Sequence, residues 1–120
     1  MTSTLQQGED LAAKGATAPR VSLEGMLDRI MFEYHFTAGE ALGAMGETPG
    51  HASLDILSIC ILVLDNGWTL LGKSAPASAE NFDPEKGVTF ARDDALRQLW
   101  PLEGYLLRDR LAAEQEDNSG

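Results

Sequence analysis

The chain has 120 residues, of which 43% are hydrophobic, and its nine basic and nineteen acidic side chains give a net charge of −10. This length predicts one globular domain. The acidic excess argues against direct binding to nucleic acid. Cys60 is the single cysteine, which excludes an internal disulfide and fits a reducing compartment. We expect no membrane span and no signal peptide, because the longest apolar run is short and the N-terminus lacks a basic start.

Residues 1–20 are polar and mixed in character, and they predict a flexible arm. A helix is predicted to follow, with Ser22 as its N-cap and with Val21 and Met26 placed for a hydrophobic staple. Its apolar positions recur at helical spacing and comprise Leu23, Met26, Leu27, Ile30 and Tyr34. A mobile, glycine-rich loop is expected next, with a short helical turn at "GEALGAM".

The segment "LSICILVLDNGWTLLGKS" predicts a β-hairpin whose turn is Asn66-Gly67. Asn-Gly favours a two-residue type I′ turn, in which both central residues have positive φ. Such a turn sets a register with the pairs Asp65–Trp68, Val63–Leu70 and Leu62–Leu71. Both faces of the first strand are apolar, and two strands alone are marginal in water. We therefore expect a third strand or a partner subunit.

Residues 67–74, "GWTLLGKS", also match the P-loop pattern G-x-x-x-x-G-K-[ST]. A P-loop surrounds phosphates with backbone N–H groups and opens a helix. Here the inner positions, Trp68 to Leu71, are bulky strand formers, and the segment that follows has no helical period. We interpret the match as accidental, and we predict Gly67 as a turn residue and Lys73 as a solvent-facing residue of an edge strand.

The motif "NFDP" predicts the start of another helix, with Asp83 as N-cap and Pro84 as its first residue. Its apolar stripe is Val88, Ala91, Ala95 and Leu99. Pro101 is predicted to break or bend this helix, so that a last helix follows. The acidic tail, residues 114–120, is expected to be disordered. Together these elements predict an α+β fold: an N-terminal helix, a central antiparallel hairpin with a possible third strand, and two C-terminal helices. The single domain would span residues 21–113 and form a homo-oligomer.

No pattern in the sequence identifies a catalytic or metal-binding residue. His35 and His51 have no second ligand at metal-binding spacing. Asp93 and Asp94 are adjacent, so on a helix they point in different directions and cannot act as an acid–base pair. We therefore expect a protein that is not an enzyme and that needs neither a cofactor nor a metal.

Two groups of residues are candidates for binding an anionic ligand. The first is Arg20 with Tyr34 and Thr37, and the second is Arg92 with Asn81. Arginine can bind phosphate with two hydrogen bonds, and an aromatic ring can stack on a base. We predict a pocket where the first group of one subunit meets the second group of its neighbour. The alternative for either arginine is an ion pair with a nearby acid.

Two stretches, "LDNGWTLLGKSAPASAENFDPEKG" and "ARDDALRQLWPLEGYLLRDRL", carry a family resemblance. They are similar to a family of small tailed-phage proteins named for a gene-49 product and a gene-66 product of enterobacterial phages. The positions that carry the likeness are Asn66, Gly67, Gly72, Ser74, Ala75, Asn81, Phe82, Asp83, Gly87, Ala91, Arg92, Ala95, Trp100, Pro101, Leu102, Gly104, Tyr105 and Leu107. "TAPRVS" and "YHFTAGEAL" resemble leader segments of longer members, so the likeness covers about the last nine-tenths of the chain. "SAPAS" replaces the family's frequent cysteine-containing "SAC".

The resemblance implies a phage protein with an accessory role in the host cytoplasm, and it supplies no catalytic residue. We predict a non-enzymatic protein that counters a host defence by binding. The preferred hypothesis is an oligomeric sponge for a small nucleotide signal. The alternative is an acidic inhibitor that docks on a host defence protein or a DNA-acting protein.

Overall fold

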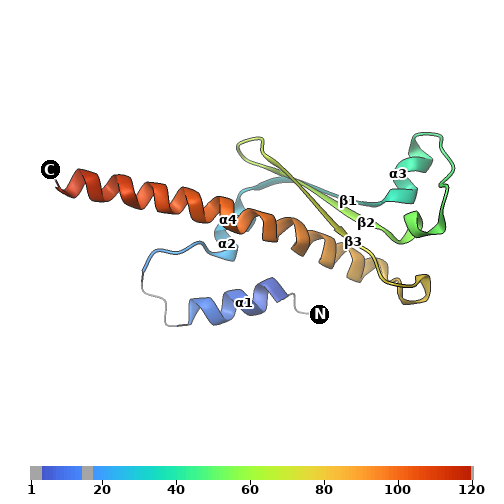
Figure 1. Ribbon diagram of the computed structural model, residues 1–120, viewed down its shortest axis with the longest axis horizontal. Helices are drawn as coiled ribbons and strands as arrows, with labels where there is room; N and C mark the ends of the chain where they lie inside the picture. The colour runs from blue at the N-terminus through green and yellow to red at the C-terminus, as the bar shows by residue number, and fades with distance from the viewer. Residues whose placement is uncertain (1–3, 15–17, 120) are drawn as a thin grey trace.

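The computed structural model describes residues 4–14 and 18–119 (Figure 1). Residues 1–3 and 15–17 of the expected arm, and residue 120 of the expected tail, lie outside the described residues. The elements in chain order are the helices and strands α1 Thr4–Ala13, α2 Leu23–Asp28, β1 Ile30–Thr37, α3 Ala38–Ala44, η1 Ala52–Ile56, β2 Ser58–Leu64, β3 Thr69–Ser74, η2 Ala79–Asn81 and α4 Pro84–Ser119. The α+β class expected from the sequence is confirmed.

The strands form one antiparallel sheet in the order β1-β2-β3, and α4 packs across one face of it. Figure 1 shows α4 crossing the sheet and then extending well beyond it toward the C-terminus. The core lies between this inner face and α4, with α1 and α2 at its edge. The buried apolar residues are Leu5, Leu23, Met26, Cys60, Leu62, Leu64, Leu70, Ala91, Ala95, Leu96 and Leu99.

Strand β1 replaces the second half of the helix expected from the sequence. That helix begins as predicted, since the Ser22 hydroxyl accepts a hydrogen bond from the Gly25 N–H. It ends at Asp28, however, and Ile30–Thr37 is a strand paired with β2. The predicted helical continuation through Tyr34 was wrong. "IMFEYHFT" is rich in aromatic residues, which pack well on a pleated surface, and β2 supplies the pairing that a short sequence pattern cannot show.

The hairpin is confirmed, but its turn and register differ from the prediction by one residue. The Leu64 N–H donates to the Trp68 carbonyl and the Gly67 N–H donates to the Leu64 carbonyl, so the loop has three residues. Among the described residues other than glycine none has a positive φ, whereas Gly67 has a φ of 86°. This is a type I turn followed by a bulged glycine rather than a type I′ turn. The Asn66 side chain accepts from the Trp68 N–H, which stabilises this loop.

The extra loop residue changes which side chains of β3 face the core. The observed pairs are Leu62–Leu70 and Ile61–Leu71. Leu70 is therefore buried and Leu71 points to the opposite face, the reverse of what the predicted register required. Two contacts hold the loop in this arrangement: the Asp65 N–H donates a hydrogen bond to the Arg29 carbonyl, and the side chains of the same two residues form an ion pair.

Helix α4 is continuous, so the prediction of two C-terminal helices separated at Pro101 was wrong. The start is as predicted: the Asp83 carboxylate accepts from the Glu85 N–H, and Pro84 is the first residue. Pro101 removes one helical hydrogen bond, but the turns on both sides continue. Helix α4 also includes residues 114–119 of the expected disordered tail, and α1 occupies much of the expected arm. The mobility that we expected of these two segments stays a prediction.

Gly72 brings β3 into backbone contact with α4. A Cβ atom at this position would lie 2.6 Å from the Ala95 nitrogen and 2.9 Å from the Ala95 Cβ, and it would be closer still to the Ala91 carbonyl oxygen. No side chain fits there. Two α4 side chains also bond the free edge of β3: Asp94 accepts from the Lys73 N–H at 2.9 Å, and Gln98 donates to the Leu71 carbonyl at 2.7 Å.

An ion pair joins the inner face of β1 to α4. Arg92 Nε lies 3.0 Å from both carboxylate oxygens of Glu33, and the His35 ring nitrogen Nε2 lies 2.6 Å from Glu33 Oε2. Burial alone would raise the pKa of Glu33, but the hydrogen bonds with His35 and Arg92 hold that pKa below its usual range. The charged carboxylate therefore stabilises the contact between the sheet and α4.

We predict that Gly72→Ala lowers the free energy of unfolding by more than about 2 kcal/mol, because the new methyl group meets backbone that cannot move aside cheaply. Gly104→Ala is the matched control, since a Cβ there meets nothing within 4 Å. The control should leave stability unchanged or raise it by up to about 1 kcal/mol. Chemical denaturation of both variants measures this, and equal stabilities would contradict the close contact.

We predict that Gly67→Val lowers the free energy of unfolding by more than about 1 kcal/mol, because a β-branched residue is strained at positive φ. Gly50→Val is the control: Gly50 has open space around it and no positive φ. A melting temperature that is the same for Gly67→Val and wild type would show that the loop does not require a left-handed residue.

We predict that Glu33→Gln lowers the melting temperature at pH 7 and that the difference from wild type shrinks in acid. A carboxyl with a lowered pKa stabilises the fold above its ordinary pKa, and this stabilisation is lost as the pH falls through the lowered value. Glu47→Gln, in an exposed loop, is the control. A Glu33→Gln deficit that is constant between pH 7 and pH 3 would contradict the charge of the carboxylate as its cause.

Candidate functional site

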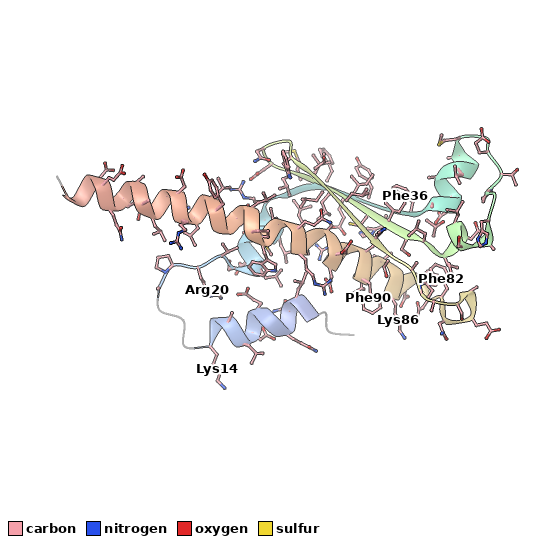
Figure 2. The ribbon with its side chains drawn as sticks, viewed as in Figure 1. Lys14, Arg20, Phe36, Phe82, Lys86 and Phe90 are labelled. Atoms are coloured by element: carbon pink, nitrogen blue, oxygen red, sulfur yellow. The ribbon has the colours of Figure 1, made fainter. Side chains whose placement is uncertain are left out.

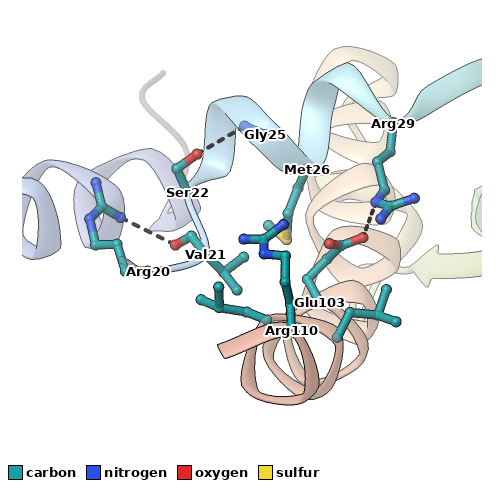
Figure 3. Close-up of a pocket in the computed structure, with 10 residues that line it drawn as sticks. Arg20, Val21, Ser22, Gly25, Met26, Arg29, Glu103 and Arg110 are labelled. Atoms are coloured by element: carbon teal, nitrogen blue, oxygen red, sulfur yellow. Dashed lines mark hydrogen bonds and ion pairs between the residues drawn. The ribbon is translucent and has the colours of Figure 1, made fainter. Parts of the chain in front are cut away.

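A pocket of about 280 Å³ lies between α2 and the C-terminal half of α4 (Figure 3). The segment before α2 contributes Arg20 and Ser22, α2 contributes Met26, and Arg29 follows directly after the helix. The other wall comes from α4. We call this cavity the arginine pocket, since its lining includes Arg20, Arg29 and Arg110.

The three guanidinium groups differ in their partners. Arg20 pairs with Glu9 of α1 at 2.5 Å and donates to the Val21 carbonyl; its hydrogen bond with Glu9 raises the pKa of Arg20. Arg29 pairs with Glu103 and Asp65. Arg110 has no ion-pair or hydrogen-bond partner in the described part of the chain, and Figure 3 shows it pointing from α4 toward α2.

The charge of the arginine pocket is opposite to that of the chain. Three of the nine basic residues line it, against a single acidic side chain, Glu103. Guanidinium groups match the geometry of phosphate and carboxylate oxygens and bind them with paired hydrogen bonds. The pocket can therefore hold an anion of small-molecule size, with Arg110 as a donor that no group of the described residues occupies.

Of the site residues predicted from the sequence, only Arg20 lines this pocket. Figure 2 shows Arg20 beside α1 and α2, far from Phe36 and Phe82 at the other end of the sheet. Tyr34 lies on the outward face of β1 and is exposed. Arg92 takes the alternative role considered for it, an ion pair with Glu33. Arg20 is likewise paired with an acid, so both arginines have structural partners. The predicted pocket between subunits stays a prediction.

Thr37 and Asn81 do come close to the same residue, Phe82. Three adjoining hollows at the N-terminal end of α4 share Phe82 as a wall; Asn81 lines one of them and Thr37 the other two. Thr37 is the N-cap of α3, where its hydroxyl accepts from the Glu40 N–H. Lys86 and Phe90 also line the hollow with Asn81 (Figure 2). Lys86 is the one lysine or arginine among the residues that line these three hollows.

Cys60, His35 and Glu33 lie together on the inner face of the sheet but do not form a nucleophilic triad. Nε2 of His35 contacts both the Cys60 sulfur, at 4.0 Å, and Glu33. A triad needs the two ring nitrogens to serve the two partners separately, and Nδ1 of His35 is buried without a partner among the described residues. Cys60 is fully buried, and burial raises its pKa to about 11. The thiol is therefore inert.

The described residues give little support for a P-loop, a metal site or a membrane-spanning helix. The P-loop match at residues 67–74 is a turn glycine followed by strand β3, as interpreted from the sequence. Within residues 4–14 and 18–119, three or more histidine, cysteine or acidic side chains nowhere gather as metal ligands would. No helix in these ranges has both the length and the apolar character needed to cross a membrane.

Arg29 and Arg110 are the pocket residues that sequence reasoning missed. They are 81 positions apart in the chain, and the pocket forms only because α4 continues past Pro101. The predicted helix break at Pro101 removed any reason to place Arg110 opposite α2. Had the helix been extended, Glu103, Leu107 and Arg110 would have shared a face at spacings of three and four.

Comparisons with known proteins give one match. No curated protein and no solved structure resembles the chain significantly. The model of the Phage protein (N4 Gp49/phage Sf6 gene 66) family, in contrast, matches residues 21–111, from the segment before α2 to far into α4. The matched region contains the whole sheet and every lining residue of the arginine pocket except Arg20. The chain therefore belongs to the phage protein family of N4 Gp49 and phage Sf6 gene 66.

Proposed function

We propose that the protein is a non-enzymatic binding protein of the phage and that the arginine pocket holds a small phosphorylated ligand. The convergence of three arginines, one of them unpaired within the described chain, is the observation that carries this proposal. An acidic protein repels anions at long range, so a local group of guanidinium donors is required for an anion to bind. The arginine pocket is the hollow that offers such a group.

Within this proposal the ligand is a small nucleotide of the host cell. Mononucleotides and short cyclic nucleotides carry one to a few phosphates, which suit a pocket with a few guanidinium groups. Sequestering such a molecule would deprive a host defence of its signal, and the protein would act as a sponge in the host cytoplasm. A sponge needs no catalytic group, which agrees with an inert Cys60 and a structural His35.

A different hypothesis is that the acidic surface docks on a host defence protein or a DNA-acting protein. The net charge of −10 favours it, because acidic surfaces attract basic partners. This hypothesis assigns no role to an unpaired arginine in a concave site. The two hypotheses therefore differ in whether binding of the partner depends on Arg110.

We predict that Arg110→Gln weakens nucleotide binding roughly tenfold or more while it leaves the melting temperature without ligand unchanged, because a charge-assisted hydrogen bond contributes about 1.5–3 kcal/mol. Arg108→Gln is the matched control, since Arg108 is an exposed α4 residue outside the pocket. The measurement is a thermal-shift and calorimetric titration with mono-, di- and cyclic nucleotides, with inorganic phosphate as reference.

Stabilisation of wild type and Arg108→Gln by at least one nucleotide, lost in Arg110→Gln, supports the proposal. A bound nucleotide that is recovered intact after heat release supports a sponge, whereas a converted product would show an enzyme. If no nucleotide or phosphate stabilises the wild type, and one host protein is captured equally by both variants, the docking hypothesis replaces the proposal.

A further inference from the structure

The sheet has an inner face covered by α4 and an outer face that no helix of the described chain covers. Along β2 the burial alternates: Ser58, Cys60, Leu62 and Leu64 are buried and the residues between them are half-buried. The pairing register carries this alternation to β1 and β3. We define the open face as the nine outward residues Phe32, Tyr34, Phe36, Ile59, Ile61, Val63, Thr69, Leu71 and Lys73.

The open face is apolar and well exposed. Phe32, Tyr34 and Leu71 have exposed fractions of 52%, 55% and 61%. The rings of Phe32 and Tyr34 are stacked, with centroids 6.5 Å apart and planes inclined by 16°, so they form one continuous aromatic surface. With the half-buried residues of β2, the apolar area is on the order of 500 Å², at the upper end of the largest patch on a typical monomer.

The distribution of acidic residues indicates which kind of partner can bind the open face. The chain has nineteen acidic residues, yet none of them is among the nine residues of the open face. A basic host protein would be attracted by carboxylates, which this face does not offer. Two copies of a chain with a charge of −10 repel each other, and they can approach closely only where no acidic residues face one another. The open face meets this condition.

The area and the shape also suit a second copy. Two such faces in contact bury about 1,000 Å² of apolar surface, and a polar rim adds to it, which reaches the size of a specific interface. Sheets pack face to face in sandwiches by interdigitating such side chains. Pairing through the β3 edge is disfavoured, because Asp94 and Gln98 of α4 already bond that edge.

We propose that the open face is a dimer interface, on which a second copy of the chain packs its own open face. Ile61, at the centre of the middle strand, lies near the centre of this contact, and Leu71 and Tyr34 lie on either side of it. Because the same surface serves both copies, the contact is closed and two-fold. This inference is independent of the arginine pocket, which lies between α2 and α4.

The test is the oligomeric state of variants by light scattering and analytical ultracentrifugation at tens of micromolar. Wild type should be dimeric or a higher multiple of the dimer. Leu71→Glu and Leu71→Lys should each weaken the dimer roughly tenfold or more, because a charge at the interface loses its hydration whichever its sign. Their circular dichroism should stay native, since Leu71 is exposed in the single chain.

Leu11→Glu is the matched control, because Leu11 is an exposed leucine of α1 outside the open face. It should leave the dimer intact. A wild type that is monomeric at these concentrations would overturn the inference. So would a Leu71→Glu variant that stays as dimeric as Leu11→Glu, since the copies would then meet through another surface.

Discussion

The contact of Gly72 with Ala91 and Ala95 sets the position of α4, and the rest of the molecule depends on that position. A helix normally rests on a sheet through a layer of side chains, but here backbone meets backbone. Another close contact lies nearby, where the lack of a side chain at Gly87 leaves room for the side chain of Ser58. These two contacts fix both the crossing point and the rotation of α4. Its C-terminal half then lies opposite α2, with Arg110 directed toward Met26 across the arginine pocket.

Helix α4 thus connects three features that are separate in the sequence. It covers the inner face of the sheet, it bonds the edge of β3 through Asp94 and Gln98, and it forms one wall of the arginine pocket. The polar contacts of its first half are internal and hold the fold together. In its second half the polar side chains are largely exposed, although Glu103 is paired with Arg29.

Local signals in the sequence predicted the local structure well. Ser22, Thr37 and Asp83 cap helices through side-chain hydrogen bonds, and of these Ser22 and Asp83 were predicted as caps from their types and spacing. The errors at β1 and α4 came from tertiary contacts, whereas the hairpin turn was a local motif predicted with a loop one residue too short. Pairing with β2 made Ile30–Thr37 a strand, and packing kept α4 helical through Pro101. The candidate site was predicted only at Arg20, because Arg29 and Arg110 meet through an arrangement that no local pattern encodes.

The three-residue loop Asp65–Gly67 has a consequence for how sequences of this kind can vary. Side chains alternate along β3, so an inserted or deleted residue would exchange the two faces of the strand if the three-residue turn were kept and β3 shifted by one position. Gly72 would then leave its place against α4, and Leu71 after an insertion, or Lys73 after a deletion, would be forced against the backbone at Ala91. A codon deleted from or inserted into this turn would thus disturb the core and the open face together. Substitutions in the loop leave that alternation intact, so loop length is constrained more tightly than loop composition.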